Sequence, residues 1–229
     1  MSEIGFGIWT VSTPYWGNTN ERDNIYLVHG ALDLGINFFD TADTYGLGYG
    51  EEFIAKALKH QRNNIVISTG SVPSTLKGVS IDEKTIVSST GALSFEKVPK
   101  EMIVIGGGYI GLELSSVWKR LGSKVTVVEF LEHIIPGMDK DISTEFLKIL
   151  TKQGINFKLN SKVTEINLVK DKAIVDFTNK KSSKRERIEC DKVLVAVGRK
   201  SNIGEDISKL GIKLDSQKKI QVNKKFETS

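Results

Sequence analysis

Six residues near the middle of the chain, Gly106-Gly107-Gly108-Tyr109-Ile110-Gly111, have the spacing G-x-G-x-x-G. In this pattern the first glycine permits a tight turn, and the second lets the backbone approach a pyrophosphate because it has no Cβ. The third allows close packing of the helix that begins here, whose free N–H groups and positive dipole end favour phosphate. The pattern therefore predicts a phosphate-binding turn, and a glycine-rich turn in another α/β domain is the alternative.

A carboxylate follows this turn at a suitable distance. Glu129 lies eighteen residues after Gly111, at the end of the largely apolar run 124–128. A carboxylate at this place accepts hydrogen bonds from an adenosine ribose and repels a 2′-phosphate. Neither Phe130 nor Leu131 supplies the arginine that a 2′-phosphate would need. The sequence therefore favours NAD over NADP as the cofactor.

The residues around this turn indicate a strand, a turn, a helix and a second strand. Met102–Ile105 is an apolar run typical of a buried parallel strand, and 124–129 is expected to be another. Further along we expect a helix over 141–153 and strands over 155–159 and 193–197. Between these strands, alternating segments at 162–168, 173–177 and 187–190 predict an antiparallel meander. The expected fold class is α/β, a Rossmann-type dinucleotide-binding domain with an antiparallel meander.

From about Ser68 to Ser229 the chain resembles dihydrolipoamide dehydrogenase, a flavoprotein of the pyridine nucleotide-disulfide oxidoreductases. The segments STGSVPS, MIVIGGGYIGLELSSVWKRLGSKVTVVEF, KVTEI and VLVAVGRKSN occur in that family's order and spacing. The resemblance implies a connector over 70–100, an NAD-binding domain over 101–200, and over 201–229 the start of a return toward a flavin domain. It also implies an oxidoreductase that passes electrons between dihydrolipoamide and NAD through FAD and a redox disulfide.

The same resemblance implies further cofactor contacts. Glu113 corresponds to a glutamate beside the nicotinamide cofactor, and Val163 and Gly198 correspond to residues that line its site. Thr69-Gly70-Ser71 is similar to an element of the family's FAD site. From the residues alone, Glu113 suits a helix surface and Val163 a core equally well. Gly198 directly follows an apolar strand and better suits a close backbone approach to a ligand.

The family's catalytic groups are not found in this sequence. Its members use a cysteine pair with a histidine and a glutamate, whereas this chain has one cysteine, Cys190, which cannot close an intramolecular disulfide. We interpret Cys190 as a packing residue. We expect an NAD-binding module without complete catalytic machinery, which could associate with a chain that supplies the missing domains. The family is homodimeric, but its interface domain is absent here. The alternative is a non-catalytic nucleotide-binding protein or a fragment.

Residues 5–69, above all GINFFDTADTYGLGYGEEFIAKAL, resemble the start of an aldo-keto reductase, a (β/α)₈ barrel that uses NADP. Asp40 and Tyr45 correspond to that family's aspartate and general-acid tyrosine, but Gly70 stands at the position of its lysine. We expect residues 1–69 to form a truncated βαβαβ part of such a barrel, with strands at 4–11, 38–39 and 65–68 and helices at 24–34 and 51–60. The two resemblances meet near residues 68–70, which suggests a fusion of two fragments. An NADP-dependent carbonyl reductase is a further alternative.

Charge changes at the same place. Residues 1–70 carry 4 Lys or Arg against 8 Asp or Glu, and residues 71–229 carry 28 against 20, which gives net charges of −4 and +8. The basic stretch Lys180–Arg187 has no interleaved aromatic, so we interpret it as a solvated hairpin loop and expect no nucleic-acid partner. His29, His60 and His133 lack metal-ligand spacing. No apolar run approaches the ~20 residues that span a bilayer, so we expect a cytoplasmic protein.

Overall fold

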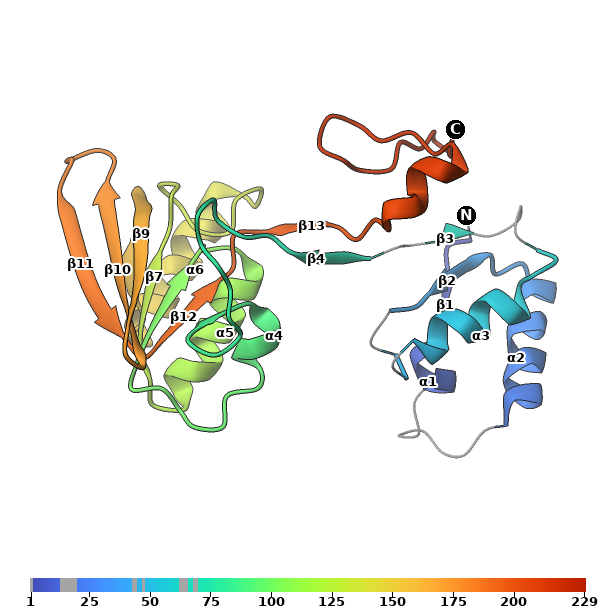
Figure 1. Ribbon diagram of the computed structural model, residues 1–229, viewed down its shortest axis with the longest axis horizontal. Coiled ribbons are helices and arrows are strands. Elements are labelled where there is room, and N and C mark those ends of the chain that lie inside the picture. The colour runs from blue at the N-terminus through green and yellow to red at the C-terminus, as the bar shows by residue number, and fades with distance from the viewer. Residues whose placement is uncertain (1, 13–19, 43–44, 47, 62–65, 68–69) are drawn as a thin grey trace. The chain divides into compact units, whose positions relative to one another are not determined.

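The computed structural model describes residues 2–12, 20–42, 45–46, 48–61, 66–67 and 70–229 (Figure 1). The chain divides into two compact units, Met1–Ser71 together with Ser201–Ser229, and Val72–Lys200. Each unit has a hydrophobic core of its own. No helix in the described ranges is long and apolar enough to cross a membrane.

The larger unit, Val72–Lys200, is built on a five-stranded parallel sheet. Its strands lie in the order β5 (Ile86–Val87), β12 (Lys192–Val195), β6 (Glu101–Ile105), β7 (Lys124–Val128) and β8 (Asn156–Lys158). A strand that is covered on both faces has a continuous apolar sequence. Residues 102–105 of β6 are accordingly all buried. The α/β class with a parallel sheet, predicted from these apolar runs, is confirmed.

Alternate residues of the central strand face two different cores. Met102 and Val104 pack in a core that includes side chains of the helices, whereas Ile103 and Ile105 pack in a second core with the antiparallel sheet. The larger unit therefore has three layers: helices, the parallel sheet and the antiparallel sheet (Figure 1). The helices are α4 (Ser89–Ala92), α5 (Tyr109–Arg120) and α6 (Lys140–Lys152).

The antiparallel sheet consists of β9 (Ser161–Val169), β10 (Lys172–Asn179) and β11 (Arg185–Cys190), in the order β11-β10-β9. Ala173, Val175 and Phe177 of β10 are buried and alternate with partly exposed residues, as expected for a sheet with one packed face. The register between β9 and β10 shifts at one point. Asp176 pairs with Glu165 but Phe177 pairs with Val163, which leaves Thr164 as a bulge residue.

Residues 70–100 are more structured than the connector that we predicted. Ile86–Val87 is an edge strand of the parallel sheet and α4 follows it directly. The turn before β5 is fixed by Asp82, whose Oδ1 accepts three backbone N–H groups, from residues 84, 85 and 86, at 2.8–2.9 Å. A separate two-stranded sheet joins β4 (Ser71–Pro73) and β13 (Arg199–Ser201). Elements of two to four residues are too short to show a hydrophobic period.

The smaller unit contains a three-stranded parallel sheet in the order β1 (Gly5–Gly7), β2 (Phe38–Asp40) and β3 (Val66–Ile67). Its helices are α1 (Trp9–Ser12), α2 (Glu21–Asp33), α3 (Tyr49–Ala57) and a short 3₁₀ helix, η3 (Glu205–Leu210). The core of this unit includes Ile8, Val28, Phe39 and Phe53.

Several expected boundaries in the smaller unit differ from the structure, and the helix expected over 51–60 spans Tyr49–Ala57. The strand expected over 4–11 ends at Gly7, because the N–H of Val11 donates to the carbonyl of Ile8 and the chain turns into α1. The helix expected over 24–34 is α2, which begins earlier, at Glu21. The side chain of Asn20 caps it there by accepting the N–H of Asp23 at 2.9 Å. Of the strand expected over 65–68, residues 65 and 68 lie outside the described ranges.

Candidate nucleotide-binding site

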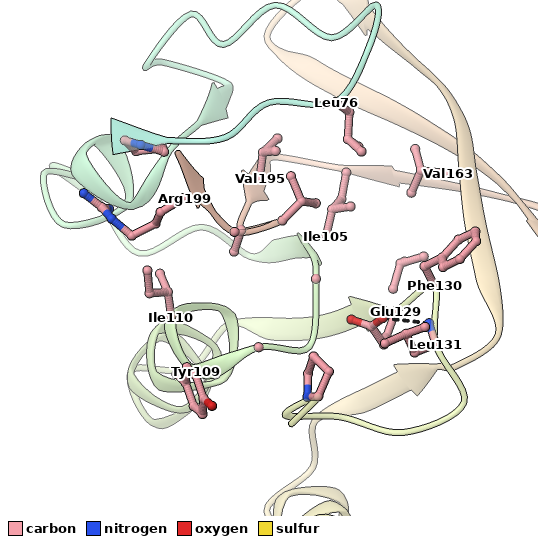
Figure 2. A pocket seen from close by; sticks show the side chains of 18 of the residues that line it. Leu76, Ile105, Tyr109, Ile110, Glu129, Phe130, Leu131, Val163, Val195 and Arg199 are labelled. Carbon is pink, nitrogen blue, oxygen red and sulfur yellow. Dashed lines mark hydrogen bonds between the residues drawn. The ribbon is translucent and has the colours of Figure 1, made fainter. Parts of the chain in front are cut away.

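A cavity of about 760 Å³ opens at the carboxyl ends of the central parallel strands of the larger unit (Figure 2). Ile105, Val128 and Val195, the last residues of β6, β7 and β12, all line it. The chain leaves β6 toward β7 on one side, whereas β12 lies on the other side, so the strand order reverses here. Open α/β sheets bind ligands at such a point. The volume lies within the range of about 300–1,000 Å³ typical of ligand pockets.

The remaining lining residues come from the loops that follow these strands and from neighbouring segments. They are Pro73, Leu76, Ser89, Gly106, Gly108, Tyr109, Ile110, Glu129, Phe130, Leu131, Pro136, Ser161, Lys162, Val163, Ala196, Val197, Gly198 and Arg199. Most of the wall is apolar. Figure 2 shows Glu129, Phe130 and Leu131 on one side of the cavity, with Ile110 and Arg199 on the other.

The glycines of the turn after β6 are required for different reasons. Gly106 has a φ of +107°, and a Cβ on it would collide with the carbonyl oxygen of Ala196. A Cβ on Gly111 would collide with the carbonyl oxygen of Gly106. Gly108 differs from both, because its φ is −80° and a Cβ there would meet nothing within 4 Å. The fold therefore does not require glycine at position 108, and the open space beside Gly108 belongs to the cavity that this residue lines.

Helix α5 begins directly after Gly108. This N-cap residue has no side chain, so no side chain accepts the first N–H groups of the helix. Unpaired N–H groups at a helix N-terminus bind anions, and the helix dipole adds to the effect. Tyr109 and Ile110, the first residues of α5, line the cavity next to this end. A phosphate group in the cavity would therefore find donors here.

Glu129 follows β7 and is held in one position. Its side chain is only 6% exposed, and its Oε2 accepts the N–H of Gly107 at 2.5 Å while its Oε1 accepts the N–H of Leu131 at 2.7 Å. An ionised carboxylate has about four acceptor positions, so each oxygen keeps one for a further donor. Because Glu129 also lines the cavity, those positions are available to hydroxyl groups of a ligand.

The structure brings together many of the residues that the sequence predicted as cofactor contacts. Those that line the cavity are Gly106, Gly108, Tyr109, Ile110, Glu129, Val163 and Gly198. Gly107 and Gly111 are buried behind the turn, where Gly107 donates to Glu129. Glu113 is exposed on α5 and does not line the cavity. Val163 and Ile166 both pack against the second core although they are three residues apart in one strand. The bulge at Thr164 adds the extra residue that puts both side chains on the same face, and Val163 thereby lines the cavity.

The other predicted site residues lie elsewhere. Gly70 and Ser71 are exposed and do not line this cavity, and Thr69 lies outside the described residues. Asp40 is exposed at the end of β2, and the ring of Tyr45 lies 6.5 Å from the ring of Trp9. Gly70, the residue at the position of the aldo-keto reductase lysine, is exposed and has a φ of +75°.

Sequence reasoning missed several lining residues. Val128 and Val195 could have been found, because residues at the carboxyl ends of adjacent parallel strands gather at one edge of the sheet. Pro73 and Leu76 come from a segment with no periodic pattern, and their place depends on tertiary packing alone.

Cys190 lies in the second core, as predicted, and is fully buried. Its Sγ lies 3.6 Å from the carbonyl oxygen of Ala173. Burial raises the pKa of the Cys190 thiol to about 12, so the thiol stays protonated at neutral pH. Among the described residues, no group of three or more His, Cys, Asp or Glu side chains could hold a metal ion.

The α/β architecture with its parallel sheet is the fold of FAD/NAD oxidoreductases. A solved structure with this fold is an NAD-dependent persulfide reductase from A. fulgidus, which aligns with 72% of this chain and 31% of its own chain at 28% identity and a TM-score of 0.61. The chain belongs to the pyridine nucleotide-disulphide oxidoreductase family, whose family model matches residues 32–229.

Curated relatives resemble the chain more strongly in sequence. Dihydrolipoamide dehydrogenase from Chaetomium thermophilum is 50% identical over 167 residues, and mitochondrial dihydrolipoyl dehydrogenase from Homo sapiens is 51% identical over 170 residues. Each alignment covers 72% of this chain and 33% of the relative. The chain thus spans about a third of the length of these relatives.

Proposed function

We propose that this chain is an NAD-binding module of a dihydrolipoamide dehydrogenase-like oxidoreductase. One observation carries the proposal: Gly108 borders open space in the same cavity that the buried carboxylate of Glu129 lines. In this proposal Gly108 and the N-terminus of α5 hold the pyrophosphate, and Glu129 holds the adenosine ribose. The sequence identity of 50–51% to dihydrolipoamide dehydrogenases over 72% of the chain supports it.

The chain's residues bind and orient the cofactor. The apolar wall formed by Ile105, Val128 and Val195 excludes water from the ends of the central strands. Glu129 accepts ribose hydroxyls with its remaining acceptor positions, and its charge opposes a 2′-phosphate, which favours NAD over NADP. NAD, when bound, supplies hydride transfer.

The wider reaction of the family is part of the proposal only by resemblance. It would pass electrons between dihydrolipoamide and NAD through FAD and a redox disulfide. The bound FAD would contact Gly70 and Ser71. The single cysteine of this chain is buried in a core and cannot form that disulfide. Other parts of a complete oxidoreductase would therefore supply the redox pair. A non-catalytic NAD-binding protein would show the same binding without the reaction.

For the smaller unit we propose an aldo-keto reductase-like origin, joined to the NAD module near residue 70. Three parallel strands in sequential order, alternating with helices, support this view, because a (β/α)₈ barrel begins in the same way. Asp40 at the end of β2 also suits it, since such barrels carry their functional groups at the carboxyl ends of strands. The match to the oxidoreductase family begins at residue 32, within this unit, so the fusion stays a prediction.

Substitution of Gly108 by valine tests the function directly. Residue 108 has a backbone conformation open to any residue, and a Cβ there meets nothing within 4 Å, so the folded chain should keep its thermal midpoint. We expect calorimetric titration of the full chain to show NADH binding that is lost in Gly108→Val, because valine fills the space of the pyrophosphate. Gly204→Val is the matched control, since Gly204 also has open space and does not line the cavity. Unchanged NADH binding by Gly108→Val, or no binding by a folded wild-type chain, would contradict the proposal.

A further inference from the structure

The turn between β10 and β11 touches the wall of the cavity. β10 ends at Asn179 and β11 begins at Arg185, so the basic stretch predicted as a hairpin loop consists of a turn followed by strand. We call residues 129–132, which directly follow β7, the wall segment. Its first three residues, Glu129, Phe130 and Leu131, line the cavity.

Backbone hydrogen bonds connect the turn to the wall segment through Asn160. The N–H of Lys180 donates to the carbonyl of Asn160 at 2.7 Å, and the N–H of Asn160 donates to the carbonyl of Leu131 at 2.8 Å. One residue later, the N–H of Ser161 donates to the carbonyl of Glu129 at 2.8 Å. The turn and the wall segment therefore keep a fixed spacing.

Two lysine side chains extend from the turn to the wall segment. The Nζ of Lys180 lies 3.5 Å from the centroid of the Phe130 ring, which is a cation–π contact. The Nζ of Lys181 lies 3.0 Å from Oε2 of Glu132, and this hydrogen bond lowers the pKa of the Glu132 carboxyl. Phe130 is 51% exposed, so burial alone does not fix its ring. The ammonium of Lys180 therefore holds the partly exposed Phe130 ring in place.

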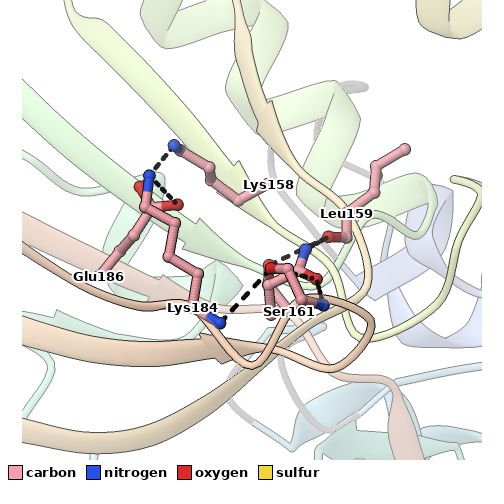
Figure 3. Close-up of polar contacts among 7 residues, drawn as sticks. Lys158, Leu159, Ser161, Lys184 and Glu186 are labelled. Atoms are coloured by element: carbon pink, nitrogen blue, oxygen red, sulfur yellow. Dashed lines mark hydrogen bonds and ion pairs between the residues drawn. The ribbon is translucent and has the colours of Figure 1, made fainter.

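The next basic residues of the stretch face other partners. The Nζ of Lys184 lies 3.8 Å from Oε1 of Glu186, and Oε2 of Glu186 accepts from Lys158 at 2.6 Å (Figure 3). Arg187 donates to both carboxylate oxygens of Asp176, at 2.8 and 3.1 Å. Lys180 thus contacts the ring of a cavity residue, whereas these other cations pair with carboxylates of the antiparallel sheet.

We propose that Lys180 is a positioning residue for the adenosine half of the dinucleotide. It holds the Phe130 ring as part of the cavity wall beside Glu129, the residue that receives the ribose. This inference rests on the proposed function, because Glu129 marks the adenosine end of the site. An aromatic ring that is already fixed loses less rotamer freedom when a base packs on it, so the ligand binds more tightly.

Titration of the full chain with ADP and with NADH tests this role. Lys180→Met keeps the apolar stem and removes the ammonium, and we expect it to weaken binding of both ligands about two- to fivefold. Lys180→Arg, which keeps a cation able to stack on the ring, should restore the affinity. Lys184→Met removes the same charge from the same turn without contact to the wall segment, and it should bind as the wild type does. All variants should keep the wild-type thermal midpoint.

A double-mutant cycle then separates positioning from a general loss of positive charge. Phe130→Ala should weaken ADP binding about five- to a hundredfold, and Lys180→Met should add no further loss in the Phe130→Ala chain. Wild-type affinity in Lys180→Met, or an equal loss with and without the Phe130 ring, overturns the positioning role while NADH binding by the wild type still supports the proposed function. A folded wild-type chain that binds neither ligand overturns both.

Discussion

Replacement of Glu129 tests the proposed preference of the cavity for NADH over NADPH. The carboxylate is almost fully buried and accepts the N–H groups of Gly107 and Leu131, so it cannot move away from a ligand. Glu129→Gln keeps the size of the side chain and one carbonyl oxygen but removes the charge. Glu129→Ala removes every acceptor. The two variants together separate the effect of charge from the effect of hydrogen bonding.

The expected magnitude follows from the hydrogen bonds that the carboxylate makes. A hydrogen bond to a charged group contributes about 1.5–3 kcal/mol, and about 1.4 kcal/mol corresponds to a factor of ten in Kd. Glu129→Ala should therefore weaken NADH binding about ten- to a hundredfold, and Glu129→Gln should weaken it less because its amide still forms a neutral hydrogen bond. NADPH should bind both variants more tightly than it binds the wild type, because the carboxylate no longer repels the 2′-phosphate.

The assay is calorimetric titration of the full chain with NADH and NADPH at one salt concentration. Thermal unfolding is measured in parallel, because Glu129→Ala leaves two backbone N–H groups without a partner and each costs about 1–3 kcal/mol of stability when buried. Glu145→Gln, at an exposed carboxylate of α6, is the control. Equal wild-type affinity for both cofactors, or undiminished NADH binding by folded Glu129→Ala, would refute the reasoning.

Three further predictions concern the cores, the turn and the reaction. Cys190 is fully buried and burial raises the pKa of its thiol to about 12, so iodoacetamide should label it only after denaturation, and rapid labelling of the native chain would contradict this. Gly111→Ala should lower stability by about 1–3 kcal/mol through its collision with the Gly106 carbonyl, whereas Gly108→Ala should leave the thermal midpoint unchanged. Equal midpoints would disprove that contrast. The 229-residue chain should form no NADH from NAD and dihydrolipoamide, and steady turnover would show that another group replaces the redox disulfide.

The central part of the site could be predicted because its signals are local. The glycine turn and Glu129 have a fixed spacing that follows from one strand, one helix and the next strand. The parallel sheet could be predicted because strands buried on both faces leave continuous apolar runs.

The rest depends on contacts between distant residues or on elements too short to have a period. Ile86–Val87 contributes only two residues to the sheet, and α1 lies within a run that resembles a strand. The contact between Lys180 and Phe130 joins residues fifty positions apart, and the sequence indicated only a charged loop. The bulge at Thr164 was also invisible, because an extra residue in one strand shows only when its partner strand is known.

The strand order also decides when the site can form during synthesis. β12 lies between β5 and β6 but is translated about ninety residues after β6. Until then one edge of β6 has no partner, and the carbonyl of Ala196 that packs against the Gly106 turn does not yet exist. An unpaired edge of this kind invites aggregation of a nascent chain, and such non-local pairing slows folding. A ribosome-bound chain arrested before residue 192 should therefore lack the cavity, although the glycine turn 106–111 and Glu129 have already been synthesised.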